Sequence, residues 1–247
     1  MLKTERQDEI LNILRGKKHA TVQYIAKQVF TSLITVRRDL KYLEDNGIVK
    51  RYYGGVSLID YDNQVVPLAL REDEKRAEKS IIARNAVEMI KSGDTVFMDA
   101  SSTVLRMVDY LDSDKNITVI TNSIKTLIAL GEKHITAYCT GGLLLENSLA
   151  FVGTFAEKAI DSLHADIMFF SSQGLSMDGD ITDFSENESH LRRHMMEHSQ
   201  KKVFLCDSGK IGKTFMFTVC NVGHVDEVVC EKPLPYELIS ILNKKTK

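Results

Sequence analysis

Apolar residues recur every three or four positions through most of the first 45 residues, which predicts a succession of amphipathic helices. One segment runs from Thr4 to Leu14, a second follows Thr21, and a third follows Ser32 and extends to Asp45. Thr21 and Ser32 stand where a hydroxyl can cap the first turn of a helix. Asn46-Gly47 then ends the third helix, because these residues tolerate left-handed backbone. The expected buried stripes are Ile10, Leu11 and Leu14; Ile25, Ala26 and Val29; and Leu33, Val36, Leu40 and Leu43.

A short β-ribbon is expected after the third helix, because residues 48–53 alternate weakly and close on Gly54-Gly55. Helix, short helix, tight turn, basic helix and ribbon make the winged variant of the helix-turn-helix, whose second helix enters the major groove of DNA. Thr35 and Arg38 are expected near base edges, and Arg37, Lys41 and Lys50 nearer phosphates. The full set of predicted DNA-binding residues is Thr21, Ser32, Thr35, Arg37, Arg38, Lys41, Lys50 and Arg51.

From Arg76 onward, helical patterns alternate with short runs of β-branched and aromatic residues. The strand-like runs are Thr95–Met98, Ile117–Ile120, Ile135–Tyr138, Ile167–Phe170, Val203–Cys206 and Glu227–Val229. Helical patterns extend from Arg76 to Ile90 and fill the gaps at about 103–112, 123–132, 154–163, 185–199 and 235–245. This alternation predicts an α/β domain with a mainly parallel sheet that is covered on both faces.

The charge of the chain is divided unevenly between these two regions. Residues 1–56 hold 11 Lys and Arg against 6 Asp and Glu, whereas residues 57–247 hold 21 against 28. A basic small domain joined to an acidic larger one fits a DNA-binding domain attached to a domain with another role. No apolar run approaches the roughly 20 residues of a membrane helix, and the charged, periodic N-terminus does not resemble a signal peptide. Four widely spaced cysteines form no Cys-x-x-Cys pair, so a cytoplasmic protein without disulfides is expected.

Small polar residues and glycines follow most of the predicted strands, and ligands of such sheets bind where the strands end. Asp99-Ala100-Ser101-Ser102-Thr103 opens a helix whose backbone N–H groups could hold a phosphate, and Lys210 adds a cation. Asp99 and Asn122 are expected to read ring hydroxyls. The predicted effector-binding residues are Asp99, Ser101, Ser102, Thr103, Thr121, Asn122, Gly141, Gly142 and Lys210.

Both regions resemble one family. Thr35-Val36-Arg37-Arg38-Asp39-Leu40, then Leu43-Glu44, Gly47 and Gly54-Gly55, is similar to the signature of DeoR-family bacterial transcription regulators. Their C-terminal domains have loops like Asp99–Thr103, Thr121-Asn122, Gly141-Gly142 and Asp207–Lys210. The resemblance implies a sugar-phosphate isomerase fold without catalysis, and a phosphorylated sugar as effector. Thr31, Ala100-Ser101 and Ser171-Ser172-Gln173 depart from the family pattern, the last two in the loops that would select the sugar.

Two motifs suggest other chemistry. Gly212-Lys213-Thr214 follows a strand, but Asp207 occupies the position where a P-loop has glycine, and a carboxylate there would repel phosphates. His190, His194 and His198 recur at four-residue spacing and could share zinc. Arg192, Arg193 and Glu197 crowd the same segment, however, and no fixed partner elsewhere is evident, so a solvated helix face without metal is expected.

The sequence therefore predicts a winged helix-turn-helix at 1–56, a linker at 57–75 and an effector and oligomerisation domain at 76–247. The expected function is a non-enzymatic repressor of carbohydrate-metabolism genes that binds operator DNA and a sugar phosphate as a homo-oligomer, without cofactor, metal or membrane. One alternative is a sugar-phosphate isomerase-like enzyme with a DNA-binding appendage. Another is a large domain that only dimerises, which would not need so many polar strand exits.

Overall fold

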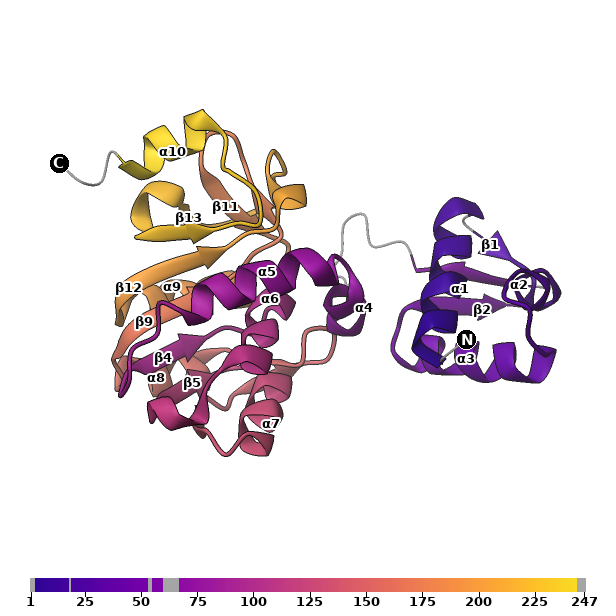
Figure 1. Cartoon of the computed structure of the whole chain (residues 1–247), viewed down its shortest axis with the longest axis horizontal. Helices are drawn as coiled ribbons and strands as arrows, with labels where there is room; N and C mark the ends of the chain where they lie inside the picture. The colour runs from indigo at the N-terminus through magenta and orange to yellow at the C-terminus, as the bar shows by residue number, and fades with distance from the viewer. Residues whose placement is uncertain (1–2, 18, 53–54, 60–66, 244–247) are drawn as a thin grey trace. The chain divides into compact units, whose positions relative to one another are not determined.

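The computed structural model describes residues 3–17, 19–52, 55–59 and 67–243, and the chain divides into two compact units, Met1–Leu70 and Arg71–Lys247 (Figure 1). This division falls inside the residues 57–75 that were predicted as a linker. The linker region also holds more regular structure than expected, because strand β3 extends to Leu58 and a helix, α4, spans Leu68–Asp73. Residues 53–54 of the predicted ribbon and 60–66 of the predicted linker lie outside the described residues.

The N-terminal unit is the winged helix-turn-helix that the sequence predicts. Its elements are α1 (Lys3–Lys17), β1 (His19–Ala20), α2 (Val22–Gln28), α3 (Leu33–Asp45), β2 (Val49–Tyr52) and β3 (Gly55–Leu58). The three strands form one antiparallel sheet in the order β1-β3-β2. Phe30 has a φ of 49°, and this left-handed residue makes the tight connection between α2 and α3.

The core of this unit joins the three predicted stripes: Ile10, Leu14, Ile25, Val36, Leu40 and Leu43 are all buried. Leu33 is the exception among the stripe residues, since its side chain is 40% exposed. It stands in the first turn of α3, beside the exposed Ile34, before the helix reaches the shared core. The prediction that Leu33 is buried was wrong, because spacing alone does not show where a helix first meets its neighbours.

The C-terminal unit is built on a six-stranded parallel sheet in the order β14-β12-β9-β4-β5-β6. Its strands are β4 (Thr95–Met98), β5 (Thr118–Thr121), β6 (Thr136–Cys139), β9 (Ala165–Phe170), β12 (Ser199–Leu205) and β14 (Glu227–Val229). Each of the six corresponds to a run predicted from sequence. The mainly parallel α/β fold is therefore confirmed.

Helices cover both faces of this sheet (Figure 1), because successive strand residues point to opposite sides. Val96 and Met98 join one apolar cluster, with α5, α6 and the short helices that follow it, whereas Phe97 joins the other, with α8 and α9. The helices of the unit are α5 (Arg76–Val87), α6 (Ser102–Leu105), η1 (Arg106–Tyr110), η2 (Ser113–Lys115), α7 (Ile124–Glu132), α8 (Thr154–Asp161), α9 (Glu186–Glu197), η3 (Ser208–Lys210), η4 (Val222–His224) and α10 (Tyr236–Asn243). None of the described helices combines the length and apolarity needed to span a membrane.

Short antiparallel strands, which the sequence did not predict, complete the unit. They are β7 (Leu143–Leu145) paired with β8 (Ala150–Val152), and β10 (Gly174–Leu175), β11 (Asp180–Asp183) and β13 (Phe217–Asn221) in a second small sheet. This second sheet packs with α9 and α10 on the face that contains Phe97.

Candidate functional site

Helix α3 presents a basic face to solvent. The Oγ atom of Ser32 accepts a hydrogen bond from the backbone N–H of Thr35 at 3.2 Å, so the predicted cap begins this helix. The hydroxyl of Thr21 caps α2 in the same way by accepting the N–H of Tyr24. The exposed cationic residues on α3 are Arg37, Arg38 and Lys41. This row of positive side chains is what a helix needs to lie against phosphates and base edges in a major groove.

A buried ion pair fixes α3 against α1. Asp39 is fully buried, and its two oxygens accept hydrogen bonds from Arg6 Nε at 2.6 Å and Arg6 Nη2 at 3.2 Å. Hydrogen bonding to this carboxylate raises the pKa of Arg6 above its ordinary value. The two-pronged contact sets the rotation of α3 about its axis and thereby the direction of its exposed face.

The wing is attached to the same helix. Arg51 on β2 holds Glu44 of α3 by its backbone N–H at 3.2 Å and its Nε at 3.1 Å. The neighbouring Lys50 is exposed. Of the two wing cations predicted to bind DNA, Arg51 is thus already engaged in joining wing and helix, and Lys50 is directed to solvent.

In the C-terminal unit, the polar loops predicted to hold an effector leave neighbouring strands at the same edge of the sheet. Asp99 follows β4, Thr121 ends β5, and Thr140 N–H donates to Thr121 O at 3.1 Å across to the loop that follows β6. Gly142 in that loop has a φ of 117°, and a Cβ atom there would lie 2.6 Å from Val152 O. The backbone at this position therefore requires glycine.

Both carboxylate oxygens of Asp99 accept hydrogen bonds from other groups of the protein. Oδ1 accepts the N–H of Ser101 at 3.0 Å, while Oδ2 accepts the N–H of Ser171 at 3.3 Å and Nε of Arg192 at 2.7 Å. Only 1% of the residue is exposed. The expectation that Asp99 reads a ring hydroxyl does not fit this geometry; the carboxylate instead fixes the loops that follow β4 and β9.

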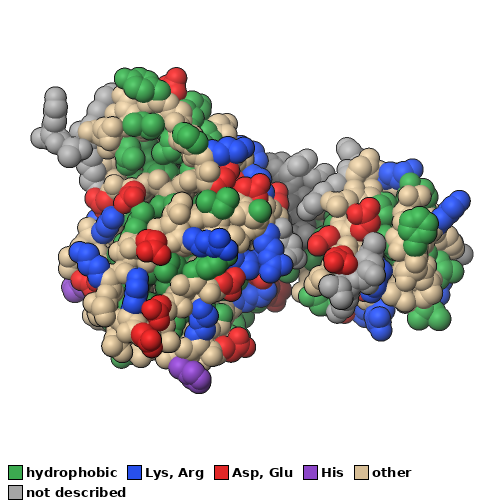
Figure 2. All heavy atoms as spheres, viewed as in Figure 1, with side chains coloured by type: hydrophobic (Ala, Val, Ile, Leu, Met, Phe, Trp, Pro, Cys, Tyr) green, Lys and Arg blue, Asp and Glu red, His purple; other side chains and the backbone are tan. Residues whose placement is uncertain are grey.

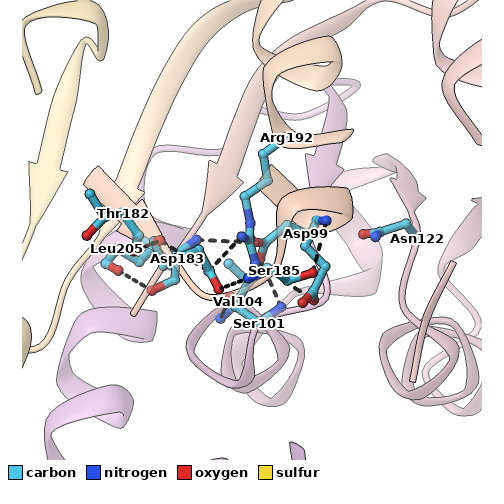
Figure 3. Close-up of polar contacts among 12 residues, drawn as sticks. Asp99, Ser101, Val104, Asn122, Thr182, Asp183, Ser185, Arg192 and Leu205 are labelled. Atoms are coloured by element: carbon cyan, nitrogen blue, oxygen red, sulfur yellow. Dashed lines mark hydrogen bonds and ion pairs between the residues drawn. The ribbon is translucent and has the colours of Figure 1, made fainter. Parts of the chain in front are cut away.

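Arg192 on α9 is the centre of this arrangement (Figure 3). Its side chain is 4% exposed and reaches between Asp99 and Asp183, with Nη1 2.8 Å from Asp183 Oδ2 and Nη2 4.0 Å from Glu188 Oε1. Burial opposes the charge, but the three carboxylates hold the pKa of Arg192 above its ordinary value. The sequence favoured a solvated position for Arg192, which is wrong, since the residue lies on the inner face of its helix.

A second charged cluster surrounds Asp207 at the end of β12. Lys75 Nζ lies 2.5 Å and Lys210 Nζ 3.5 Å from its carboxylate, and Lys210 also donates to Ser171 Oγ at 2.7 Å. Lys79 on α5 is buried beside them and donates to the carbonyl oxygen of Arg71. Burial works against the charge of Asp207, but Lys210 and Lys75 lower its pKa below the ordinary value. Burial and the nearby Lys210 lower the pKa of Lys79 to about 8.

These cations lie next to the predicted effector loops, because Ser171 contacts both Lys210 and Asp99. In the space-filling view, Lys and Arg side chains gather over the N-terminal part of α5 (Figure 2). Apart from Gly141, which is half-buried, the remaining predicted residues are buried where the strands end or in the first turn of α6: Ser101 (5% exposed), Ser102 (7%), Thr103 (0%), Thr121 (0%) and Asn122 (4%). The site thus combines packed hydroxyl and amide groups with an excess of lysines at one end.

Comparison with known proteins assigns the chain. The family described as "DeoR-like helix-turn-helix domain" matches residues 6–62, and the one described as "DeoR C terminal sensor domain" matches residues 74–232. The chain belongs to the DeoR family. It is 32% identical to the HTH-type transcriptional regulator YulB of Bacillus subtilis over 100% of this chain and 96% of that protein. It is 31% identical to the lactose phosphotransferase system repressor of Staphylococcus epidermidis over 94% of this chain and 93% of that protein.

This DeoR-family chain is accordingly a DNA-binding transcriptional regulator, as predicted, and its relatives are named as regulators rather than enzymes. The sensor domain is also similar to ribose 5-phosphate isomerase A from Methanocaldococcus jannaschii, with a TM-score of 0.42, 14% identity, and coverage of 56% of this chain and 55% of that chain. A likeness this distant transfers neither a site nor an activity. Because the relatives are named as transcriptional regulators, the alternative of an enzyme with a DNA-binding appendage is set aside.

Sequence analysis did not find Lys75, Lys79 and Arg192, which the fold places beside the predicted effector loops. Lys75 stands in a charged run that was interpreted as linker. Lys79 and Arg192 did carry a signal: each is a charged residue on the apolar stripe of its helix, three positions before the buried Ile82 and Met195 respectively. A charge at such a position must have a buried partner or a ligand.

Proposed function

We propose that this DeoR-family regulator represses genes of carbohydrate metabolism and that a phosphorylated sugar, bound where the strands of its sensor sheet end, controls its hold on DNA. The observation that carries the proposal is the cluster of Lys75, Lys79 and Lys210 beside the predicted effector loops. The similarity to a lactose phosphotransferase system repressor supports a sugar-linked role.

The lysine cluster favours an anionic ligand. Lys79 is 4% exposed, and burial and the nearby Lys210 lower its pKa to about 8, so its positive charge is destabilised in the ligand-free protein. A phosphate dianion placed between these cations would favour the charged form of Lys79 and bind through charge-assisted hydrogen bonds. Asp207 already neutralises part of the cluster, which leaves Lys210, with its side chain 15% exposed, as the cation best placed to meet a ligand.

The hydroxyl groups of the sugar are bound by residues other than Asp99. Asn122 donates its Nδ2 to Phe151 O at 3.0 Å, whereas its buried Oδ1 has no hydrogen-bond partner among the described residues. Thr103 Oγ1 is likewise buried without a partner in the described part of the chain. In Figure 3 the amide end of Asn122 points toward the Asp99 loop. An unsatisfied acceptor and an unsatisfied hydroxyl at the strand ends suit a polyhydroxylated ligand.

Calorimetric titration of a panel of sugar phosphates against wild type, Lys210→Ala and Lys213→Ala tests this site. Lys213 is an exposed lysine in the segment between β12 and β13, so its replacement removes the same charge without touching the lysine cluster. We expect one sugar phosphate to bind wild type and Lys213→Ala alike, and Lys210→Ala at least about 10-fold more weakly, since a charged hydrogen bond contributes about 1.5–3 kcal/mol. DNA binding without effector should be unchanged in both variants.

Equal affinity of wild type and Lys210→Ala for the sugar phosphate would show that the effector binds elsewhere. An independent check is thermal unfolding with the sugar phosphate at about 100 times its dissociation constant, which should stabilise the folded chain by about 2.7 kcal/mol. The non-phosphorylated sugar at the same concentration should have little effect if the lysine cluster supplies the affinity.

We further propose that the regulator acts as a homo-oligomer in the cytoplasm, where DNA and phosphorylated sugars are found together. One winged domain makes few base contacts, and operator selectivity is usually reached by holding two such domains on repeated half-sites. Light scattering at micromolar concentration should give at least the mass of a dimer. A monomeric mass under conditions of full operator binding would contradict this part of the proposal.

A further inference from the structure

The outer face of α9 brings a row of histidines against a row of carboxylates on α8. His190, His194 and His198 recur at four-residue spacing and so lie on one side of α9, opposite Arg192. Glu157 and Asp161 have the same spacing on α8. The two helices share one apolar core, which fixes the two rows side by side. The sequence did not show a partner for these histidines, whereas the fold supplies two.

The distances within this cluster are short. His190 Nδ1 lies 3.1 Å from Glu157 Oε1, and His194 Nδ1 lies 3.3 Å from Asp161 Oδ1. One potential ligand atom from each of Glu157, His190 and His194 lies within 4.8 Å of the other two. Such atoms are about 3.3 Å apart around a tetrahedral ion with bonds near 2.0 Å. Small side-chain rotations would therefore close the three groups around an ion.

A further sign is the state of His194. Its Nδ1 atom is shielded from solvent and, although close to Asp161, has no well-directed hydrogen bond within the described residues. Buried polar atoms are rarely left in this condition. The side chain of His190 is 50% exposed, so an ion can reach the cluster from solvent.

We propose that Glu157, His190 and His194 bind a divalent transition-metal ion of the Zn²⁺ type. Two imidazoles separated by one helical turn and a carboxylate from a second element form a ligand set that zinc uses with water in its fourth position. The two nitrogen ligands select against Ca²⁺ and Mg²⁺, which take oxygen ligands.

The ion joins α8 to α9 on the side of α9 opposite Arg192. Because Arg192 holds Asp99 and Asp183 from the other side of the same helix, the ion restrains the element that orders the loops after β4 and β11. The inference concerns metal binding alone, so it stands or fails independently of the sugar-phosphate proposal.

The test is a titration of chelator-treated, untagged full-length chain with Zn²⁺ by calorimetry and with Co²⁺ by visible absorption. We expect a saturable site with one ion per chain and the intense bands of four-coordinate Co²⁺. His190→Ala and Glu157→Gln should each weaken binding by at least about 10-fold, which is the smaller loss seen on removing even an outer-shell partner. The matched controls are His19→Ala and Cys139→Ser, which remove an exposed imidazole and an exposed thiol elsewhere in the chain and should bind like wild type.

Circular dichroism without metal checks that the variants are folded, and Zn²⁺ should raise the unfolding temperature of wild type and of both controls but not of His190→Ala. The proposal is overturned if wild type does not bind Zn²⁺ or Co²⁺, if the His190 and Glu157 variants bind as wild type does, or if either control loses as much affinity as they do.

Discussion

Replacing Arg192 by methionine should be the most damaging single change in the sensor domain outside its apolar core. The substitution keeps an unbranched side chain but removes the only cation within the cluster of Asp99, Asp183 and Glu188, as the described residues show it. All three acids are buried, with exposures of 1%, 3% and 4% respectively. Arg192 offsets one of the three negative charges and hydrogen-bonds Asp99 and Asp183, so the variant leaves all three buried carboxylates without a cation.

The expected loss in the free energy of unfolding follows from the removal of this positive charge. Breaking a buried ion pair by removing one partner destabilises proteins by about 3–5 kcal/mol, since the remaining charge has neither water nor counter-ion. Arg192 makes two charged hydrogen bonds shorter than 3 Å, so the upper part of that range is expected. The triple variant Arg192→Met, Asp99→Asn, Asp183→Asn should recover part of the loss, because it also removes two of the three buried negative charges.

Urea unfolding followed by circular dichroism measures this effect, with Arg193→Met as the matched control. Arg193 is the neighbouring arginine, but its guanidinium lies nearer the surface and donates to Thr218 O at 2.7 Å. We expect the control to lose about 1 kcal/mol or less, as for a single partly exposed hydrogen bond. If the two single variants lose similar stability, or if the triple variant is no more stable than Arg192→Met, Arg192 does not stabilise the domain by offsetting these buried charges.

Three further predictions concern DNA, pH and backbone. Arg38→Ala should reduce discrimination between operator and altered sequences by about 1–3 kcal/mol, whereas Lys50→Ala should weaken binding to all sequences alike and lower its salt dependence. Gel-shift titrations at several salt concentrations distinguish the two effects, and an unchanged operator affinity in the double variant Arg37→Ala/Arg38→Ala would refute the assignment. Burial and the nearby Lys210 lower the pKa of Lys79 from the ordinary value of 10.5, expected in the unfolded chain, to about 8 in the folded chain. Between these two pH values the unfolded chain binds more protons, so the stability of the folded chain should rise with pH. Across this pH range, the free energy of unfolding of wild type should rise by about 3 kcal/mol relative to that of Lys79→Met. If the difference between wild type and Lys79→Met does not change with pH, the prediction is wrong. Gly142→Ala should destabilise the sensor domain in thermal unfolding, whereas Gly131→Ala, in a helix with open space at its Cβ, should not.

The architecture could be predicted from sequence because its signals are local. The central strands of the parallel sheet are buried on both faces, so they read as continuous apolar runs such as Ile167–Phe170 in β9. The caps at Thr21 and Ser32 and the break at Asn46-Gly47 involve residues within four positions of one another. The strands β7, β8, β10, β11 and β13 could not be found in this way, because two to five residues carry too little pattern and their pairing depends on the rest of the fold.

In both candidate sites the sequence showed the residues but not their partners. The basic face of α3 and the polar strand exits were visible in the sequence, since both follow from the element on which they lie. The partners that decide what those residues can do were not visible: Arg192 is 93 positions from Asp99, and Lys75 is 132 positions from Asp207. The contact with Arg192 converted Asp99 from an expected ligand-reading group into a loop anchor.

The sequence alone thus determined which elements form, which of their faces are apolar, and which family the chain resembles, because hydrophobic period, caps and turn residues act over a few positions. The tertiary structure alone decided which charges meet. It buried Lys79 and Arg192, paired Glu157 with His190, and tied Arg51 to Glu44. The physical reason is that burial and Coulomb energy depend on distance in space, and the order of residues along the chain does not contain that distance.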